Sequence, residues 1–186
     1  PICSRPHASA PFPRRRNRCR PQHAVAHPGD TDLNALRMRP SLPTLVLAQL
    51  VLTAFLCGLI WVVQGVLYPL FALVGPAEFP AFHSAEMNRI GWIVAPLMTV
   101  ELLLALGAVL SAPRDSLPWL AAAFLAVVWA STAFIQVPLH QELSVTGYDA
   151  ERLGRLTAGN WIRTLAWTAR GVVLWVWLRR LLRTTG

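Results

Sequence analysis

His83, His140 and Arg163 are residues whose types could do chemistry in this chain. Each histidine has a carboxylate close by in sequence, Glu86 for the first and Glu142 for the second. Two imidazoles can ligate a haem iron, or hold a transition metal together with a carboxylate, and either could serve as a general base. An arginine binds anionic or phenolic oxygens by charge-assisted hydrogen bonds. We therefore treat all three as candidate catalytic residues, and the two histidines as candidate ligands of a metal or haem.

Further polar and aromatic side chains recur near these residues at helical spacing. Gln136 and His140 are four residues apart, as are Arg163 and Trp167, so each pair shares one face of a helix. A helix that faces only lipid does not carry such a stripe, because polar groups within membrane spans face a bundle interior or a water-filled cavity. The predicted ligand-binding residues are Gln64, Tyr68, Gln136, His140, Asn160, Arg163 and Trp167.

Each of these assignments has a structural alternative. Gln64 and Gln136 could form interhelical hydrogen bonds without a ligand. Asn160 could cap the start of a helix, a position that asparagine favours. Arg163 could extend to the lipid headgroups.

Two charged residues lie far inside apolar sequence. Glu101 is about twelve residues into one apolar segment and Arg170 about ten into another. At a helical rise of ~1.5 Å per residue, both lie ~15–18 Å below the membrane surface. An unpaired charge at that depth costs several kcal/mol. We predict that Glu101 and Arg170 form an ion pair. Its simplest role is to fix the register of two helices, with a proton relay or a ligand contact as the alternative.

The elements that must position these residues are four long apolar segments. Of the 186 residues, 54% are hydrophobic and 14% are charged, against about 25% charged in soluble domains. The segments, about 44–71, 90–110, 117–139 and 161–178, can each supply the ~20 residues of a membrane span. Backbone groups in lipid must be satisfied internally, which predicts helices. Short connections predict an all-α, antiparallel up-down bundle of four transmembrane helices over residues 44–186.

Residues 1–43 form an Arg- and Pro-rich tail that we expect to be disordered. Its arginine run, "PRRRNRCR", could bind anionic lipid or nucleic acid. The alternative is that translation starts at Met38, so that the residues before it have no selected role. We favour this alternative and expect no nucleic acid partner.

The placement of arginines predicts how the bundle is oriented. Arg37 and Arg39 precede the first segment, and Arg179, Arg180 and Arg183 follow the last. The positive-inside rule then places both termini in the cytoplasm of a bacterial cytoplasmic (inner) membrane, with an oligomer as an open alternative. Aromatic belts are expected at the two interfaces, with Trp61, Trp92 and Trp161 on the outer side and Trp119, Trp175 and Trp177 on the inner side.

Several functional classes lack their motifs. The cysteines, Cys3, Cys19 and Cys57, form no C-x-x-C pair, which argues against a dithiol exchange enzyme. The sequence contains no Walker A loop, no G-x-G-x-x-G fingerprint and no G-x-S-x-G elbow. It also has no C-x-x-C-H haem attachment, H-E-x-x-H or Glu-x-x-His di-iron motif, so any metal or haem would have to be held by His83 and His140 without a motif.

Four blocks of sequence carry a family resemblance: "WVVQGVLYPLF" (61–71), "FHSAEMNRIGWIVAPLMTVE" (82–101), "QVPLHQEL" (136–143) and "NWIRTLAWTAR" (160–170). Over roughly residues 38–180, they resemble a family of uncharacterised bacterial four-helix integral membrane proteins. That family is distantly similar to the anthrone-oxygenase-like domain-of-unknown-function family. The second similarity lies in the general architecture and in Asn160, Trp161 and Arg163. The Trp-x-x-Arg-His-type pattern of that region is not reproduced here, because Arg163 is followed by Thr164. The resemblance implies oxidation of polycyclic phenols without a metal or flavin.

The leading functional hypothesis is a membrane protein that binds a small amphiphilic ligand or cofactor, quinone- or phenol-like, in a polar site in the outer half of the bilayer. One alternative is a membrane oxygenase or oxidoreductase that acts on a small aromatic substrate. Another is a non-catalytic structural subunit of a membrane complex, in which the polar residues only set helix register.

Overall fold

The computed structural model describes residues 41–184, and every regular element in that range is helical. The predicted tail therefore lies outside the described residues except for its last three positions. Residues 41–184 form four helical rods, and two of these rods contain a short π-helical segment. The elements are α2 (Leu42–Val62), η1 (Val63–Leu67), α3 (Tyr68–Phe71), α4 (Phe79–Ser111), α5 (Ser116–Ser131), η2 (Thr132–Gln136), α6 (Val137–Thr146) and α7 (Ala150–Thr184).

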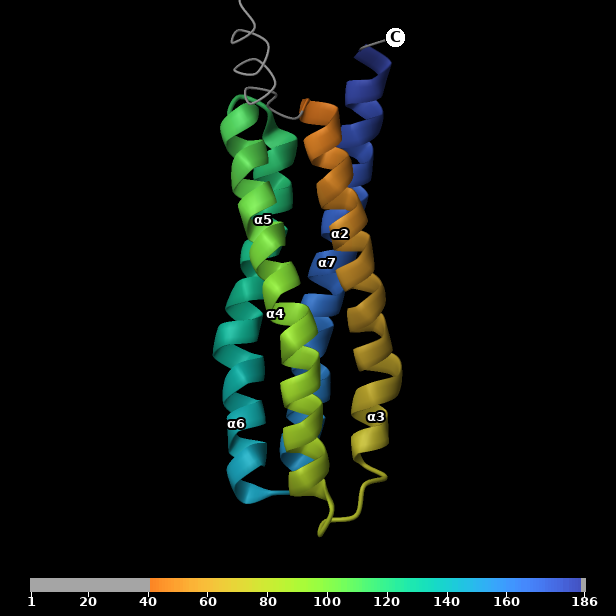
Figure 1. The fold of residues 1–186 in the computed structure, drawn as a ribbon, viewed down its shortest axis with the longest axis vertical. Coiled ribbons are helices and arrows are strands. Elements are labelled where there is room, and N and C mark those ends of the chain that lie inside the picture. The colour runs from red at the N-terminus through yellow and green to blue at the C-terminus, as the bar shows by residue number, and fades with distance from the viewer. Residues whose placement is uncertain (1–40, 185–186) are drawn as a thin grey trace, which may run out of the picture. The chain divides into compact units, whose positions relative to one another are not determined.

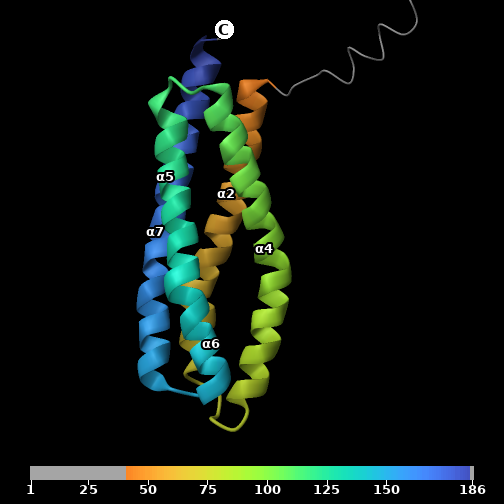
Figure 2. The ribbon, with the colours of Figure 1, turned by 90° about the vertical axis from the view of Figure 1, so that its left-hand side faces the viewer.

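The four rods pack antiparallel in up-down order, as the sequence predicted. In Figure 1 the rods run vertically, and α2, α4 and α5 alternate in direction along the chain. The connections from α3 to α4 and from α6 to α7 lie together at the lower end (Figures 1 and 2). The turn from α4 to α5 and the end of α7 lie at the opposite end. We refer to these as the α3/α4 end and the α4/α5 end.

Three of the rods extend well beyond the apolar segments that predicted them. The second rod begins at Phe79 rather than near residue 90, the third ends at Thr146 rather than near 139, and the last spans Ala150–Thr184 rather than 161–178. Most of residues 75–89 and 140–160, which lie between the predicted segments, is therefore helix. Hydropathy marks where a helix is apolar, whereas backbone hydrogen bonding continues through the amphipathic turns that follow.

The last rod starts at an N-cap residue, Asp149, which was not predicted from the sequence. Asp149 Oδ1 accepts a hydrogen bond of 2.9 Å from the backbone N–H of Arg152, which is the usual N-cap geometry. This bond holds the pKa of Asp149 below its ordinary value. Gly147, with a φ of 75°, ends the preceding helix in a conformation that suits glycine. Asn160 lies in the interior of α7, so its assignment as an N-cap was wrong.

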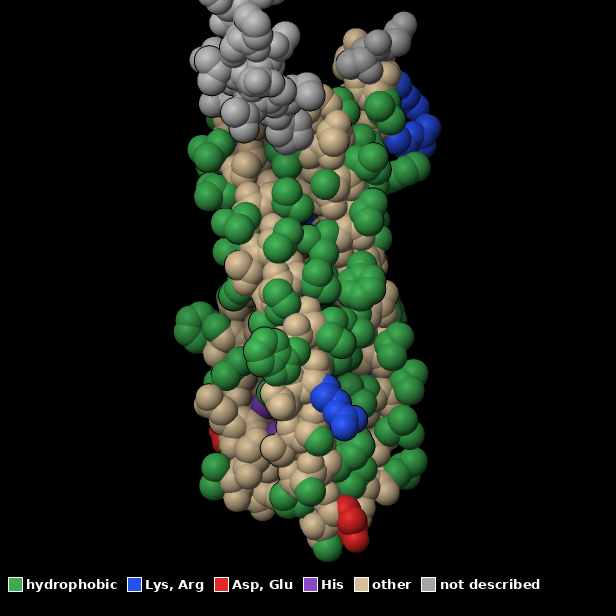
Figure 3. All heavy atoms as spheres, in the orientation of Figure 1, with side chains coloured by type: hydrophobic (Ala, Val, Ile, Leu, Met, Phe, Trp, Pro, Cys, Tyr) green, Lys and Arg blue, Asp and Glu red, His purple; other side chains and the backbone are tan. Residues whose placement is uncertain are grey.

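Three rods are long and apolar enough to cross a membrane by length and composition, namely Leu42–Phe71, Phe79–Ser111 and Ser116–Thr146. The fourth, α7, is not among them, since it carries Asn160, Arg163 and Arg170 in its central part. These three side chains are buried, at 0–8% exposure. On the face shown in Figure 3, hydrophobic side chains cover most of the length, and charged side chains are few. The bundle is therefore a membrane protein by helix length and hydropathy.

The tryptophans divide into outward and inward sets. Trp92 is 78% exposed, and Trp61, Trp119, Trp161 and Trp175 are also exposed. Trp177, predicted for the inner belt, is instead fully buried beside Leu174 and Leu178. Its position on α7 places it on the same face as Leu174, which points into the core.

Candidate functional site

Two buried polar clusters lie at different depths along α7. The first surrounds the pair predicted between Glu101 and Arg170, and it is present: Arg170 Nε lies 2.9 Å from Glu101 Oε1, with both side chains fully buried. The cluster separates two apolar cores, one containing Trp167 and the other containing Trp177.

Both charged side chains of this first cluster are hydrogen-bonded to their neighbours. Glu101 accepts hydrogen bonds from Thr53 Oγ1 at 2.5 Å and from Trp167 Nε1 at 3.0 Å. Arg170 donates through Nη1 to the Ala121 carbonyl at 2.6 Å and through Nη2 to Gln49 Oε1 at 3.1 Å. One guanidinium thus ties α7 to α2, α4 and α5. Both charges are matched within the cluster, which suits a structural role, while Gln49 Nε2 has no hydrogen-bond partner among the described residues.

The second cluster, nearer the α3/α4 end, is built around Arg163. Its Nε donates to Asn160 Oδ1 at 2.9 Å, and its Nη2 lies 3.3 Å from Tyr68 OH and 3.5 Å from Gln136 Oε1. Asn160 Nδ2 in turn donates to Gln64 Oε1 at 2.8 Å. Arg163 is only 8% exposed, yet all of its partners are neutral groups, and within residues 41–184 it forms no ion pair.

The two π-helical segments aim the partners of Arg163 inward. In each segment a backbone N–H bonds to the carbonyl five residues earlier, Tyr68 to Val63 and Val137 to Thr132. Each segment ends just before a proline, Pro69 or Pro138. A proline cannot donate a backbone hydrogen bond and clashes with the carbonyl four residues earlier, so a widened turn relieves both problems.

The wider turns have a direct consequence for the side chains. Gln64 and Tyr68 are both buried on the first rod, and Gln136 and His140 are both buried on the third. The two rods thereby present their polar groups to α7 at the same level. Pro69 and Pro138, each within an apolar segment, were the sequence signal for these widened turns.

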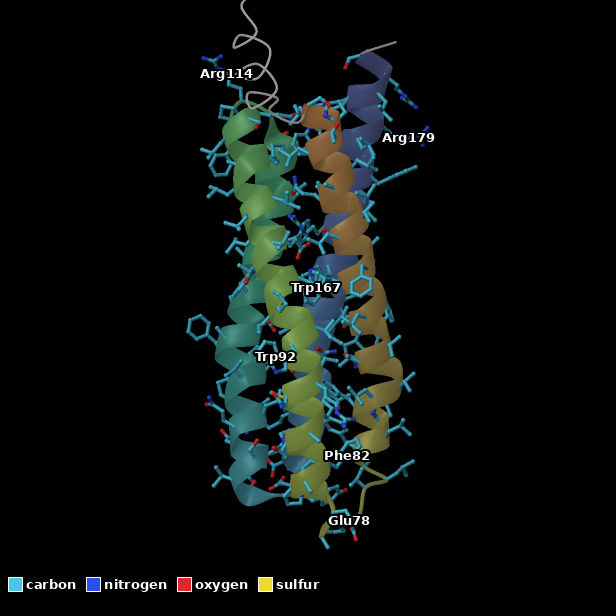
Figure 4. All side chains as sticks on the ribbon, viewed as in Figure 1. Glu78, Phe82, Trp92, Arg114, Trp167 and Arg179 are labelled. Carbon is cyan, nitrogen blue, oxygen red and sulfur yellow. The ribbon has the colours of Figure 1, made fainter. Side chains whose placement is uncertain are left out.

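A cavity of about 300 Å³ lies against this cluster, with walls from all four rods. Its lining is mostly apolar; α4 contributes Met87, Ile90, Val94 and Met98, among others. Its polar lining includes Tyr68, Gln136, His140 and Arg163, together with Glu86, Thr99 and Thr132. Trp167, which points into the bundle in Figure 4, also lines it. Clefts of ~300–1,000 Å³ with apolar walls and a few convergent polar groups are typical of small-molecule sites.

Two polar atoms on residues that line the cavity have no hydrogen-bond partner among the described residues. They are Glu86 Oε2 and Trp129 Nε1, one an acceptor and the other a donor. Leaving a buried polar atom unpaired costs about 1–3 kcal/mol. The walls of the cavity thus hold unused capacity for both accepting and donating hydrogen bonds.

The two candidate histidines lie side by side. His83 Nε2 is 3.0 Å from His140 Nδ1, and the rings are stacked with centroids 5.2 Å apart. His140 Nε2 faces Tyr68 OH at 3.2 Å, so these rings belong to the same network as Arg163. In Figure 3 only a small part of the histidine side chains is visible, in a recess between helices.

The candidate residues thus occupy two layers. Tyr68, Gln136, His140, Arg163 and Trp167 line the cavity. Gln64, Asn160 and His83 do not. Asn160 accepts from the Arg163 guanidinium and donates to Gln64, and His83 is hydrogen-bonded to His140.

Sequence reasoning did not place Ser144 or Trp129 at the site. Ser144 Oγ lies 3.3 Å from His83 Nδ1. Its position four residues after His140 was the available signal, because residues at this spacing share a helix face.

Across the described range, no group of three or more His, Cys, Asp and Glu side chains is arranged to hold a metal ion. The two imidazoles are hydrogen-bonded to each other.

Comparison with known proteins gave no match, either to a protein-family model, to a curated protein or to a solved structure.

Proposed function

We propose that this protein binds a small amphiphilic molecule with an anionic or phenolic oxygen in the cavity beside Arg163. One observation carries the proposal: α7 buries two arginines, and only one of them is neutralised. Arg170 has Glu101 at 2.9 Å, whereas Arg163 has only neutral partners and lines a cavity. A buried guanidinium without a counter-charge is costly. An anionic or phenolic oxygen at the cavity wall would supply the missing interaction.

The other residues that line the cavity indicate which chemical class of ligand would fit. Residues from α2 and α4 such as Leu56, Ile90 and Met98 suit an aromatic or branched apolar body. Glu86 and Trp129 offer one further acceptor and one further donor. A phenol or a quinone-like molecule combines a flat apolar body with oxygens that accept from Arg163, and a phenol or hydroquinone can also donate to Glu86.

The proposal includes the placement of the bundle in a membrane. All four rods would cross the bilayer, because the polar residues of α7 are buried and its exposed side chains include Ile162, Leu165 and Val172. The α4/α5 end carries Arg114, seen at that end in Figure 4, and Arg179. We place this end in the cytoplasm of a bacterial inner membrane by the positive-inside rule. The cavity then lies in the outer half.

The test is equilibrium binding of an alkyl-substituted nitrophenol to purified protein in lipid nanodiscs. Replacing Arg163 by Gln should weaken binding roughly 10- to 100-fold, the value of one charge-assisted hydrogen bond. Arg155→Gln, on the exposed face of the same helix, is the matched control and should bind like the wild type. Equal affinity in all three proteins would contradict the proposal.

A further inference from the structure

A continuous chain of hydrogen bonds connects the surface of the bundle with the cavity. It starts at Ser144, which is exposed in the last turns of α6. Ser144 Oγ lies 3.3 Å from His83 Nδ1, and His83 Nε2 lies 3.0 Å from His140 Nδ1. His140 Nε2 lies 3.2 Å from Tyr68 OH, which is 3.3 Å from Arg163 Nη2. The four inner side chains are all buried.

The direction of every proton in this chain follows from its two ends. Ser144 has a single hydroxyl proton and donates it to the His140 carbonyl at 2.8 Å, so its oxygen must accept from His83 Nδ1. A neutral His83 then has a bare Nε2, which must accept from His140 Nδ1. By the same step His140 Nε2 is bare and accepts from Tyr68 OH, for whose single proton Gln136 Oε1 at 3.3 Å is the competing acceptor. The Tyr68 oxygen accepts from Arg163. All the donors therefore point from the cavity toward the surface.

We propose that this chain removes a proton from a phenolic ligand in the cavity and delivers it to water at the surface. This step rests on the proposed function, because it needs a phenol beside Tyr68 and Arg163. The ligand O–H bond breaks, and its proton passes to the Tyr68 oxygen while the tyrosine proton moves to His140 Nε2. His140 passes its Nδ1 proton to His83 Nε2, and His83 passes its own to Ser144.

The final proton leaves from Ser144 to water, so one ligand O–H bond is exchanged for one O–H bond in solvent. Both histidines remain neutral and end as the Nε2-protonated tautomers. The product is a phenolate beside the Arg163 guanidinium, which is the charge that this arginine lacks. The ionisable groups around the two imidazoles are Tyr68, which bonds to His140, and Arg163, which bonds to Tyr68. Glu86 from α4 lines the same cavity as His140.

The arrangement assigns roles to two residues that no ligand in the cavity would touch. His83 and Ser144 do not line the cavity. His83 is held in place by Phe79, which stacks on it at 5.4 Å between ring centroids. Both residues would act through His140, as positioning and relay groups.

The test uses the same alkyl-substituted nitrophenol in nanodiscs, since its phenol and phenolate differ in colour. After a rapid jump to higher pH, the bound probe should become phenolate roughly 100-fold more slowly in His83→Ala protein than in wild type. Its affinity should change by less than about threefold, within about 0.7 kcal/mol. Added imidazole should restore the rate, which a purely structural role of His83 does not predict.

Ser144→Ala should also slow the exchange, and Thr146→Ala is its matched control. Both lose a hydroxyl that bonds to the carbonyl four residues earlier, but among the described residues only Ser144 is also hydrogen-bonded to a histidine side chain. An unchanged rate in both His83→Ala and Ser144→Ala would overturn the relay. If the wild type did not bind the probe at all, the proposed function would fall instead.

A second measurement decides the relay without any ligand. Nitrogen-15 NMR of histidine-labelled protein should show both His83 and His140 as neutral, Nδ1-protonated rings, assigned by comparison with the His83→Ala protein. An Nε2-protonated His140 in the ligand-free protein would reverse the chain and overturn the inference.

Discussion

At the scale of single residues, the two arginines of α7 are treated differently by their surroundings. Arg170 is paired with Glu101 and hydrogen-bonded to three rods. Arg163 has neutral polar partners, which fix the conformation of its side chain but do not neutralise its charge. Spacing along the helix does not separate these cases. The difference lies in what the neighbouring rods supply at each depth.

The Glu101–Arg170 cluster should be essential to stability. Glu101→Gln leaves the Arg170 guanidinium buried without a counter-charge, and the free energy of unfolding should fall by about 3–5 kcal/mol. Replacing both residues by Met removes both charges and should cost less, with the residual loss set by the orphaned Trp167 Nε1 and Gln49 Oε1. Denaturant unfolding in mixed micelles, followed by tryptophan fluorescence, measures both.

The control for that series is Glu142→Gln, which removes an exposed carboxylate paired with Arg152. Exposed ion pairs contribute about 1 kcal/mol or less. A loss in Glu101→Gln no larger than in this control would show that the buried pair does not set stability.

At the scale of elements, the close approach of α7 to η2 positions Gln136. A Cβ atom on Gly159 would lie 2.8 Å from Ile135 Cγ2 and 3.1 Å from Gln136 Nε2. The glycine is therefore needed for the helices to approach, and Gln136 would have to move if it were replaced.

Gly159→Ala should weaken binding of the nitrophenol probe and lower stability, because it displaces a residue of the cavity wall. Gly154→Ala on the same helix is the matched control, since a Cβ there meets nothing within 4 Å. That control should be neutral or slightly stabilising, by up to about 1 kcal/mol, from the better helix propensity of alanine. Calorimetric unfolding together with probe titration compares the two; equal behaviour would contradict this role of Gly159.

The elements also show how far the sequence could predict this structure. Apolar runs were enough for the number, order and antiparallel packing of the rods. They could not locate the helix ends, since the turns after residue 79 and before residue 160 are helical but polar. Helical spacing placed Gln136 and His140 on one face, and in the structure both lie in one hydrogen-bonded cluster with Tyr68 and Arg163. Which of its members reach the cavity depends on the widened turns before Pro69 and Pro138, and spacing does not reveal these.

At the scale of the whole molecule, charge is unevenly distributed between the two ends of the bundle. Of the described residues, Arg114, Arg179, Arg180 and Arg183 lie toward the α4/α5 end with one aspartate, Asp115. The other end carries more acids than arginines, including Glu78, which lies there in Figure 4. This asymmetry is the basis of the proposed orientation.

Cysteine labelling tests the orientation. In a background without native cysteines, Ala77→Cys in the α3–α4 connection should react with a membrane-impermeant maleimide on intact cells. Ser111→Cys at the α4–α5 turn should react only after permeabilisation. Both positions are exposed in the structure, so access to the side chain is matched. The opposite labelling pattern would reverse the bundle in the membrane.

The most direct measurement is photo-crosslinking of a phenol that carries a diazirine, followed by mapping of the labelled residues in nanodisc-embedded protein. We predict adducts on the α4 side chains that line the cavity, such as Met87, Ile90 and Val94. These adducts should be lost with excess competing phenol and in Arg163→Gln protein. Adducts confined to lipid-facing residues such as Trp92 and Leu103, unaffected by competitor, would contradict a ligand site beside Arg163.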